Sequence, residues 1–327
     1  MLAYILRRIA SAISVIVVTL IASFLLFFVA PTDPAGAICG NRCTPARVAE
    51  INKSLHLSDP IINQIGGYLG GLVNGRTFTS AGVTIHCSAP CLGYSYTLGQ
   101  PVTRLIGQAL PVTLSIVFGS AIVYLTLGTM LGTIAARHRG TPLDRATVGS
   151  SLTVGAMPYF VVALIVALYV AGPILPRAQW IPITQSPLGW FNGLLAAWLT
   201  IGATNSASYT RYSRASMIES LGEDYIRTAR AKGISERRVI YRHGLRAAAT
   251  PVVTIFGLDL AFAMTGAIFT ETIFGLPGIG LLTLRAFFQF DLPVLMAGVL
   301  IGSTVLVLMN LIVDIFYTVL DPRVRLA

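Results

Sequence analysis

The sequence predicts an all-α membrane protein with six transmembrane helices and a small extracytoplasmic element between the first two. The chain of 327 residues is 54% hydrophobic and only 11% charged, and its mean hydropathy is +0.75. A transmembrane helix needs roughly 20 apolar residues to cross the lipid. Lipid offers no hydrogen-bonding partner to a backbone group, so each must be paired within the helix. Six stretches meet this need: Ile9–Ala30, Leu110–Ala135, Val148–Val170, Leu188–Ala207, Pro251–Phe269 and Pro293–Tyr317.

The first stretch follows Arg7 and Arg8, a pattern that a secretory signal peptide shares. Its apolar run is 22 residues long, whereas a signal core has roughly 7 to 15. Phe28 also stands where a cleavage site before Ala30 would need a small residue. We therefore expect residues 1–30 to remain as an N-terminal transmembrane helix.

The distribution of basic residues predicts the orientation. With the N-terminus in the cytoplasm, 16 of the 23 lysines and arginines fall on the cytoplasmic side, as the positive-inside rule requires. Both termini, including a tail at 321–327, are then cytoplasmic, and the protein is a multi-pass protein of a plasma membrane. The net charge of +10 reflects this topology and anionic lipid, and it does not indicate a nucleic-acid partner.

The first outer segment, 31–104, holds all four cysteines. Apolar spacing predicts helices at 45–56 and 61–73, and the glycine-rich stretch 74–99 predicts loop or short strands. Paired spacings of this kind also occur in zinc sites, but an oxidising compartment favours disulfides. Links between the two pairs would remove more chain entropy than links within them, although strain can reverse that preference. The candidates are Cys39, Cys43, Cys87 and Cys91.

The cytoplasmic segment 211–246 carries the main functional signal. Gly222 is expected to end one helix, and a short helix runs from Asp224 to Lys232 with Gly233 as its left-handed stop. Acidic residues lie at the start of this short helix and basic residues at its end, which suits the helix dipole. Small residues at 229, 231 and 233 would let another backbone approach closely. The segment is either a docking helix for a soluble partner or a basic loop that maintains topology.

Ionisable residues inside spans are functional candidates, because an unpaired charge in lipid costs several kcal/mol. Asp259, in the fifth span, would either line a polar pathway or pack against an arginine or a hydroxyl. Asp314, near the inner end of the sixth span, favours a structural salt bridge. His243 is expected to cap or pack at the membrane surface.

The chain lacks the sequence motifs of the common catalytic sites. It contains no nucleotide-binding Gly-Lys-Ser/Thr, no His-Glu-x-x-His and no Gly-x-Ser-x-Gly. We therefore expect no enzyme activity, no cofactor and no metal in this chain. A membrane protein of this kind could also be a secondary transporter driven by an ion gradient, or a scaffold that recruits a cytoplasmic partner. The first alternative is disfavoured by the lack of a visible repeat and by the single candidate acid.

Several motifs resemble one known family along nearly the whole chain. The run DYIRTARAKG at 224–233 is similar to the cytoplasmic signature loop of permease subunits in bacterial dipeptide and oligopeptide ABC importers. The general version of that loop begins Glu-Ala-Ala, where this chain has Arg227-Thr228-Ala229. Further similar segments are Tyr4–Arg8, Pro31–Pro34, Leu55–Pro60, Tyr241–Arg246, Glu271–Gly280 and Asp321–Arg325. By this resemblance, the stretch 76–92 is longer than the family pattern.

The resemblance implies a type I ABC importer permease fold in the inner membrane, with a core at 105–320. It also implies a second, homologous permease, two cytoplasmic ATPase subunits that hold ATP and magnesium, an extracytoplasmic substrate-binding protein and a peptide as substrate. The signature loop in this family couples transport to ATP hydrolysis by docking on the ATPase. The residues at the corresponding positions are Tyr225, Arg227, Thr228, Ala229, Ala231, Lys232 and Gly233.

Overall fold

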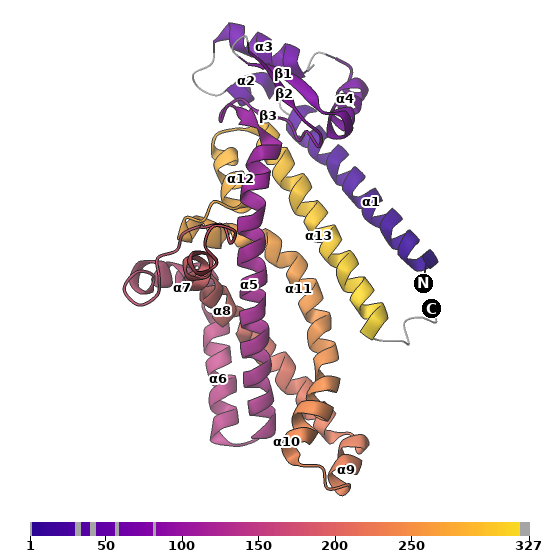
Figure 1. The fold of residues 1–327 in the computed structure, drawn as a ribbon, viewed down its shortest axis with the longest axis vertical. Helices are drawn as coiled ribbons and strands as arrows, with labels where there is room; N and C mark the ends of the chain where they lie inside the picture. Colours follow the sequence, from indigo (N-terminus) through magenta and orange to yellow (C-terminus); the bar gives the residue numbers. More distant parts are fainter. Residues whose placement is uncertain (1, 30–33, 40–43, 56–58, 81–82, 321–327) are drawn as a thin grey trace. The chain divides into compact units, whose positions relative to one another are not determined.

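The computed structural model describes residues 2–29, 34–39, 44–55, 59–80 and 83–320, and these residues are mostly helical (Figure 1). They divide into two compact units. The first unit comprises residues 1–113 and 277–311, and the second comprises 114–276 and 312–327. Two long helices, α5 (Val102–Arg137) and α13 (Leu292–Leu320), contribute residues to both units.

The first unit begins with α1 (Leu2–Phe24) and its π-helical continuation η1 (Leu25–Val29). Three short helices follow, and the unit also contains α12. Their bounds are α2 (Pro34–Cys39), α3 (Pro45–Leu55), α4 (Ile61–Asn74) and α12 (Ile279–Phe288). The helices expected at 45–56 and 61–73 are thus confirmed as α3 and α4.

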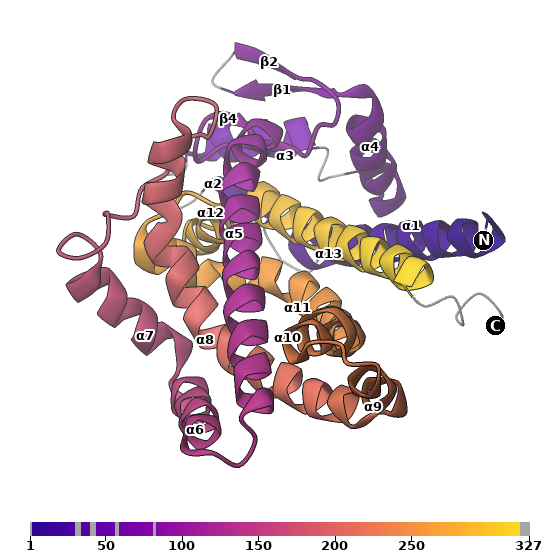
Figure 2. The same cartoon turned by 60° about the horizontal axis from the view of Figure 1, so that its bottom comes forward.

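Short strands occupy the glycine-rich stretch, as the sequence suggested. β1 (Arg76–Ser80) and β2 (Val83–Cys87) pair as antiparallel strands (Figure 2). Phe78 of β1 pairs with Ile85 of β2. A second small pair joins β3 (Tyr94–Ser95) to β4 (Gln100–Pro101). Phe78 is 1% exposed and stacks on Tyr94, with ring centroids 5.9 Å apart. An aromatic core therefore holds the hairpin in place.

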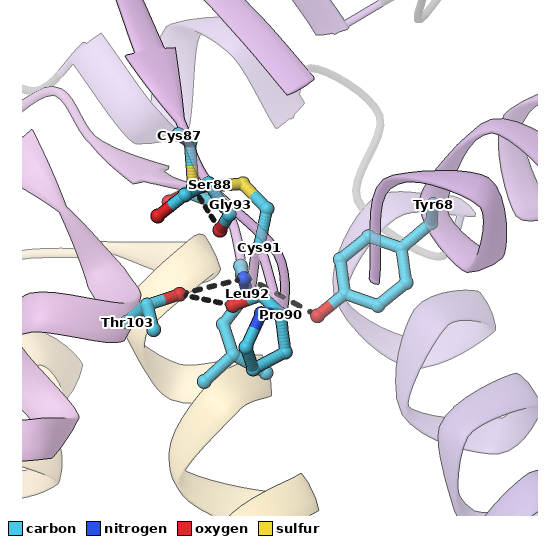
Figure 3. Close-up of a disulfide and its surroundings, with 8 residues drawn as sticks. All are labelled: Tyr68, Cys87, Ser88, Pro90, Cys91, Leu92, Gly93 and Thr103. Atoms are coloured by element: carbon cyan, nitrogen blue, oxygen red, sulfur yellow. Dashed lines mark hydrogen bonds between the residues drawn. A yellow bond between two sulfur atoms is a disulfide. The ribbon is translucent and has the colours of Figure 1, made fainter. Parts of the chain in front are cut away.

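The disulfide in this unit differs from the expected pairing. It joins Cys87 to Cys91, within one pair, with Cα atoms 5.6 Å apart (Figure 3). The preference for links between the pairs was therefore wrong for these two residues. The turn between the two cysteines brings their Cα atoms within bonding range, so local geometry outweighs the loop-entropy argument. Cys43 and the side chain of Cys39 lie outside the described residues.

Hydrogen bonds fix the chain that follows this disulfide (Figure 3). The Thr103 hydroxyl donates to the Pro90 carbonyl at 2.6 Å and accepts from the Leu92 N–H at 3.0 Å. The Tyr68 hydroxyl, from α4, donates to the Leu92 carbonyl at 3.3 Å. The disulfide turn is thereby joined to α4 and to the first turn of α5.

The second unit contains the rest of α5 and the helices that follow it. These are α6 (Pro142–Ala156), α7 (Tyr159–Ile165), π-helical η2 (Val166–Val170), α8 (Pro187–Gly222), α9 (Asp224–Ala231), α10 (Glu236–Arg238), π-helical η3 (Val239–Gly244) and α11 (Leu245–Phe274). Both Figures 1 and 2 show α8 alongside α5.

Glycines on α5 and α8 let these two helices approach closely. A Cβ added at Gly128 would lie 2.4 Å from the Cβ of Tyr209, and one at Gly132 would lie 2.6 Å from the Thr210 carbonyl oxygen. From α8, a Cβ at Gly202 would lie 2.3 Å from a methyl carbon of Val123. Since real Cβ atoms do not approach so closely, α5 and α8 depend on these glycines for their packing.

The predicted spans are confirmed in part. In the described residues, three helices are long and apolar enough to cross a membrane: Arg7–Val29, Val102–Arg137 and Leu292–Ile312. The number rises to five if two bent pairs each count as one span. One of these pairs, Pro142–Ala156 with Tyr159–Val170, bends by 93°. The span expected at Val148–Val170 is therefore not one continuous helix, because Pro158 has no N–H to donate and disfavours a helical residue before it.

Candidate functional site

The short helix α9 is bounded by the residues that the sequence singled out. α8 ends at Gly222 and Glu223 is the N-cap of α9. At the other end Gly233 has a φ of +71°, and its N–H donates to the Arg230 carbonyl at 2.9 Å. The Ile234 N–H donates to the Ala229 carbonyl at 3.3 Å. These two bonds form a Schellman motif, so the expected left-handed stop is confirmed.

A small apolar core holds α9 against its own loop. Ile226 is fully buried and Ala229 is 6% exposed, and both pack with Val239. Leu221 and Ile234 cover this cluster. The expectation that Ala229 offers a small surface to a partner was therefore wrong for its side chain, which faces the core of the loop. Residues 231 and 233 remain exposed.

The outer face of α9 is polar and solvent-exposed. Tyr225 is 44% exposed, and Arg227, Thr228 and Lys232 are also exposed. The Arg227 guanidinium lies 3.2 Å from Asp224 on the same helix. The Thr228 hydroxyl donates to the Asp224 carbonyl at 3.0 Å. This face has both charged groups and a partly exposed tyrosine, and tyrosine and arginine are enriched at protein–protein interfaces.

A salt bridge connects α9 to α10. The Arg230 guanidinium donates to both carboxylate oxygens of Glu236, at 2.8 and 3.1 Å. This hydrogen bonding with Arg230 holds the pKa of the Glu236 carboxyl below its usual range. The pair is therefore ionised at neutral pH. Ser235 is the N-cap of α10, and its side chain makes no capping hydrogen bond.

One hydroxyl joins the loop to the two long helices beside it. Ser220, near the end of α8, donates to the Gly244 carbonyl at 3.0 Å. Its oxygen also lies 2.9 Å from the Tyr225 hydroxyl. Below this point Met217 and Ile240 are buried together with Ala136 and Ala248. The loop is therefore fixed to α8 and α11 at the point where it leaves them.

A partly buried salt bridge, which the sequence did not reveal, joins α6 to α8. Arg214 donates to both oxygens of Asp144, at 2.7 and 2.8 Å, and the Gly140 N–H donates to the same carboxylate at 2.9 Å. Thr141 caps α6 by accepting from the Asp144 N–H. The pattern Thr-Pro-x-Asp marks a helix start and could have located this carboxylate. Its partner on α8, 70 residues away, carries no such local signal.

Asp259 lies on α11 and is exposed in this chain. Its carboxylate accepts a hydrogen bond from the Tyr209 hydroxyl of α8 at 2.8 Å. A hydroxyl partner of this kind was one of the two alternatives for this residue. Because Asp259 is exposed in this chain, its carboxylate could also line a polar pathway, which was the other alternative. The side chain of Asp314 lies outside the described residues, and His243 is part of η3 and half-buried.

A cavity of about 380 Å³ lies among α5, α6, α7, α8 and α11. Its polar lining comes from Ser120, Tyr159, Thr204, Asn205 and Thr270. The Tyr159 hydroxyl lies 2.6 Å from the Thr270 hydroxyl, which joins α7 to α11 at the cavity wall. The bend between α6 and α7 also borders the cavity, through Gly155 and Met157. The sequence reading did not assign these residues, because their helices meet only in the folded chain.

Comparison with known families covers almost the whole chain. Residues 128–326 match the binding-protein-dependent transport system inner membrane component family. Residues 1–117 match the N-terminal domain of the same membrane components. The chain belongs to this family. The larger of these two matches covers the α9 loop, the Asp144–Arg214 salt bridge and the cavity, apart from the α5 residues of the cavity before 128.

Curated relatives of this permease align over nearly their full length. A putative peptide transport system permease protein of Brucella abortus is 34% identical over 327 residues, which is 99% of each chain. The oligopeptide transport system permease protein AppB of Bacillus subtilis is 32% identical, over 99% of this chain and 100% of its own. The dipeptide transport system permease protein DppB of Haemophilus influenzae is 33% identical, with the same coverage. The chain is thus a permease subunit of an ABC importer.

Proposed function

We propose that this permease imports peptides and that α9 is the helix through which ATP hydrolysis drives it. The proposal rests mainly on α9, a helix whose apolar side is buried in its own loop and whose polar side stays exposed. Tyr225, Arg227, Thr228, Ala231, Lys232 and Gly233 form or border that exposed face, and Ala229 supports it from below. The printed names of the relatives, which concern peptide, oligopeptide and dipeptide transport, support the choice of substrate.

The complex that this role requires has several subunits. The permease pairs with a homologous second permease, two ATPases bind ATP and magnesium in the cytoplasm, and an extracytoplasmic binding protein delivers the peptide. Closure of the ATPases moves α9, and the loop transmits the movement to α8 and α11 through the Ser220 hydrogen bonds. The chain crosses the inner membrane six times, with both termini in the cytoplasm. Its spans include α8, α11 and the bent pair α6–α7.

Transport by the reconstituted complex tests this proposal. Vesicles that contain the two permeases and the ATPases, with the binding protein added, should accumulate peptide only when ATP is supplied to the ATPase side. An ionophore that dissipates ion gradients should leave this uptake intact. Uptake that needs an ion gradient and not ATP would instead make the protein a secondary transporter. A chain that binds the ATPases without any uptake would be a scaffold.

Cross-linking tests the role of α9 directly. A cysteine introduced at Lys232, which is exposed at the end of α9, should cross-link to an ATPase subunit. A cysteine at Arg139, exposed in the loop between α5 and α6, serves as the comparison on the same side of the membrane. Equal cross-linking at both positions would contradict a specific docking role for α9.

Asp259 is proposed as a residue of the translocation pathway. Asp259→Asn removes the charge but retains an oxygen that can accept the Tyr209 hydrogen bond. We expect peptide uptake to fall while the assembled complex is retained. Tyr209→Phe removes the hydrogen bond and keeps the charge, so it isolates the packing contribution. A loss of assembly in both variants, with no separate transport defect, would assign Asp259 to helix packing.

A further inference from the structure

We infer that the cavity among α5, α6, α7, α8 and α11 binds the backbone of the transported peptide, with the side-chain amide of Asn205 as its main recognition group. The inference rests on the proposed function, and it adds a substrate-contacting site inside the permease itself. A cavity of about 380 Å³ falls in the range of small-molecule sites, roughly 300 to 1,000 Å³. It therefore accommodates a short segment of peptide.

Asn205 has hydrogen-bonding capacity that the described part of the protein leaves unused. Its side chain is exposed and lines the cavity, and no hydrogen bond to it occurs among the described residues. An asparagine amide offers two N–H donors and one carbonyl acceptor. A peptide bond offers one acceptor and one donor, so the two amides are complementary. Polar groups in transmembrane segments are costly unless they find partners, which makes this amide a functional candidate.

The other polar groups of the lining are already partly engaged. The Ser120 hydroxyl donates to the Val117 carbonyl at 2.9 Å, and the Thr204 hydroxyl donates to the Thr200 carbonyl at 2.9 Å. Their protons are used within their own helices, so they can serve a ligand mainly as acceptors. Asn205 is consequently the lining side chain that is best able to donate and to accept at the same point.

The break between α6 and α7 adds backbone acceptors at the same cavity. Met157 and Pro158 have extended conformations there. The Val154 carbonyl accepts a hydrogen bond from the Met157 N–H at 3.2 Å, and the other carbonyls at the end of α6 lack the N–H donors that a continuing helix would provide. Non-helical backbone at membrane depth is tolerated where it lines a hydrated cavity or is buried in protein. Gly155 and Met157 border the cavity. The bend thus supplies carbonyl oxygens suited to the N–H groups of a bound peptide.

The charge distribution favours a neutral ligand segment. Among the described side chains, none that lines the cavity is charged. Arg211 approaches it near Gly155, where an added Cβ would lie 3.8 Å from the guanidinium, and Asp259 lies one helical turn from Ala263 on α11. The remaining lining is apolar and includes Met157, a side chain that adapts to varied shapes. Such a site recognises the peptide backbone and tolerates different side chains.

The test uses the complete complex in vesicles and compares two asparagines of α8. Asn205→Leu removes the amide that faces the cavity. Asn192→Leu makes the same change on the same helix, at a position outside the cavity lining. The probes are an equimolar mixture of alanine di-, tri- and pentapeptides, and trialanine in which the nitrogen of the central residue is methylated. Uptake is quantified by mass spectrometry, and complex assembly is measured in parallel.

We expect Asn205→Leu to lower ATP-dependent uptake roughly three- to tenfold, as the loss of one hydrogen bond to a ligand predicts. Asn192→Leu should leave uptake unchanged. The preference of the wild type for trialanine over its N-methylated form should exceed the preference of the binding protein alone. That excess should disappear in Asn205→Leu, which a purely structural defect would not cause. Thr204→Val, which alters a neighbouring lining hydroxyl, should retain part of it.

The outcomes separate the two claims. If the wild type shows no ATP-dependent uptake of the peptide mixture, the proposed function fails, and the site inference fails with it. If the wild type transports but Asn205→Leu behaves like the wild type or like Asn192→Leu, only the site inference is overturned. Loss of the second permease from the complex on Asn205→Leu would also overturn it, because Asn205 would then be a packing contact between subunits.

Discussion

The α9 loop (residues 223–244) and the hairpin region (residues 61–101) are stabilised in different ways. The α9 loop depends on neighbours in sequence, since its Schellman motif, its salt bridge and its three-residue core all lie between 226 and 239. The hairpin region depends on distant partners: Ser95 donates to Asp291, which is 196 positions away and 1% exposed. A loop that stabilises itself locally can move as one body. The hairpin region is fixed to its unit by contacts that must form together.

The largest effect is expected in the hairpin region, where Phe78→Ala removes a ring that is 1% exposed and stacked on Tyr94. Truncating a buried phenylalanine costs about 3 to 5 kcal/mol. Limited proteolysis of the intact complex, with cleavage sites mapped between residues 61 and 101, measures the loss. Val83→Ala, a change at a 61% exposed position of the same hairpin, should leave the cleavage rate unchanged. Resistant Phe78→Ala protein would show that the region does not depend on its distant contacts.

A smaller effect is expected from Cys87→Ser. The disulfide closes a loop with a sequence separation of only 4, and the chain-entropy relation gives about 2 kcal/mol for so short a loop. The variant should be cleaved faster than the wild type under non-reducing conditions. Addition of a reductant should remove most of that difference. If reduction leaves the wild type as resistant as before, the Thr103 and Tyr68 hydrogen bonds suffice to hold the turn.

The third prediction concerns the stop of α9. A Cβ at Gly233 would meet nothing within 4 Å, and φ is +71°, so Gly233→Val strains only the backbone, by about 1 to 2 kcal/mol. Transport coupled to ATP hydrolysis should fall while membrane insertion is retained. Gly233→Asn is the matched control, because asparagine accepts the left-handed conformation more readily. Normal coupling in Gly233→Val would contradict the role of the Schellman motif.

The smallest effect is expected from Glu236→Gln. Both partners of this pair are substantially exposed, with side chains 43% and 51% accessible, so solvent screening limits the loss to about 0.2 to 1 kcal/mol. The folded-state pKa of Glu236 lies below its unfolded value. The contribution is therefore present above the unfolded pKa and is lost as the pH falls through the folded pKa. Hydrogen exchange of α9 at neutral and acidic pH, in both proteins, checks this: the difference should vanish in acid and at high salt.

The sequence predicted the features that depend on neighbouring residues. The bounds of α9, its left-handed stop at Gly233 and the helices α3 and α4 all follow from caps, spacing and glycines close by. The cysteine pairing was misjudged because loop entropy carries no information about the local turn between Cys87 and Cys91. The Asp144–Arg214 bridge and the cavity around Asn205 went unassigned because each joins helices that are far apart in sequence. The bend at Pro158 was missed although its signal is local, since the apolar run continued through it.

The glycine contacts between α5 and α8 determine where the second unit is stiff. The backbone of α5 lies against α8 at Gly128 and Gly132, without long side chains to yield between them, and the Trp198 indole donates to the Ser115 carbonyl at 2.8 Å. Sliding one helix along the other would force backbone atoms into each other. The pair of α5 and α8 therefore resists this movement. The joint at Met157 and Pro158 lacks the helical hydrogen bonds that resist bending. Strain applied to the unit is consequently absorbed at this joint, which borders the cavity.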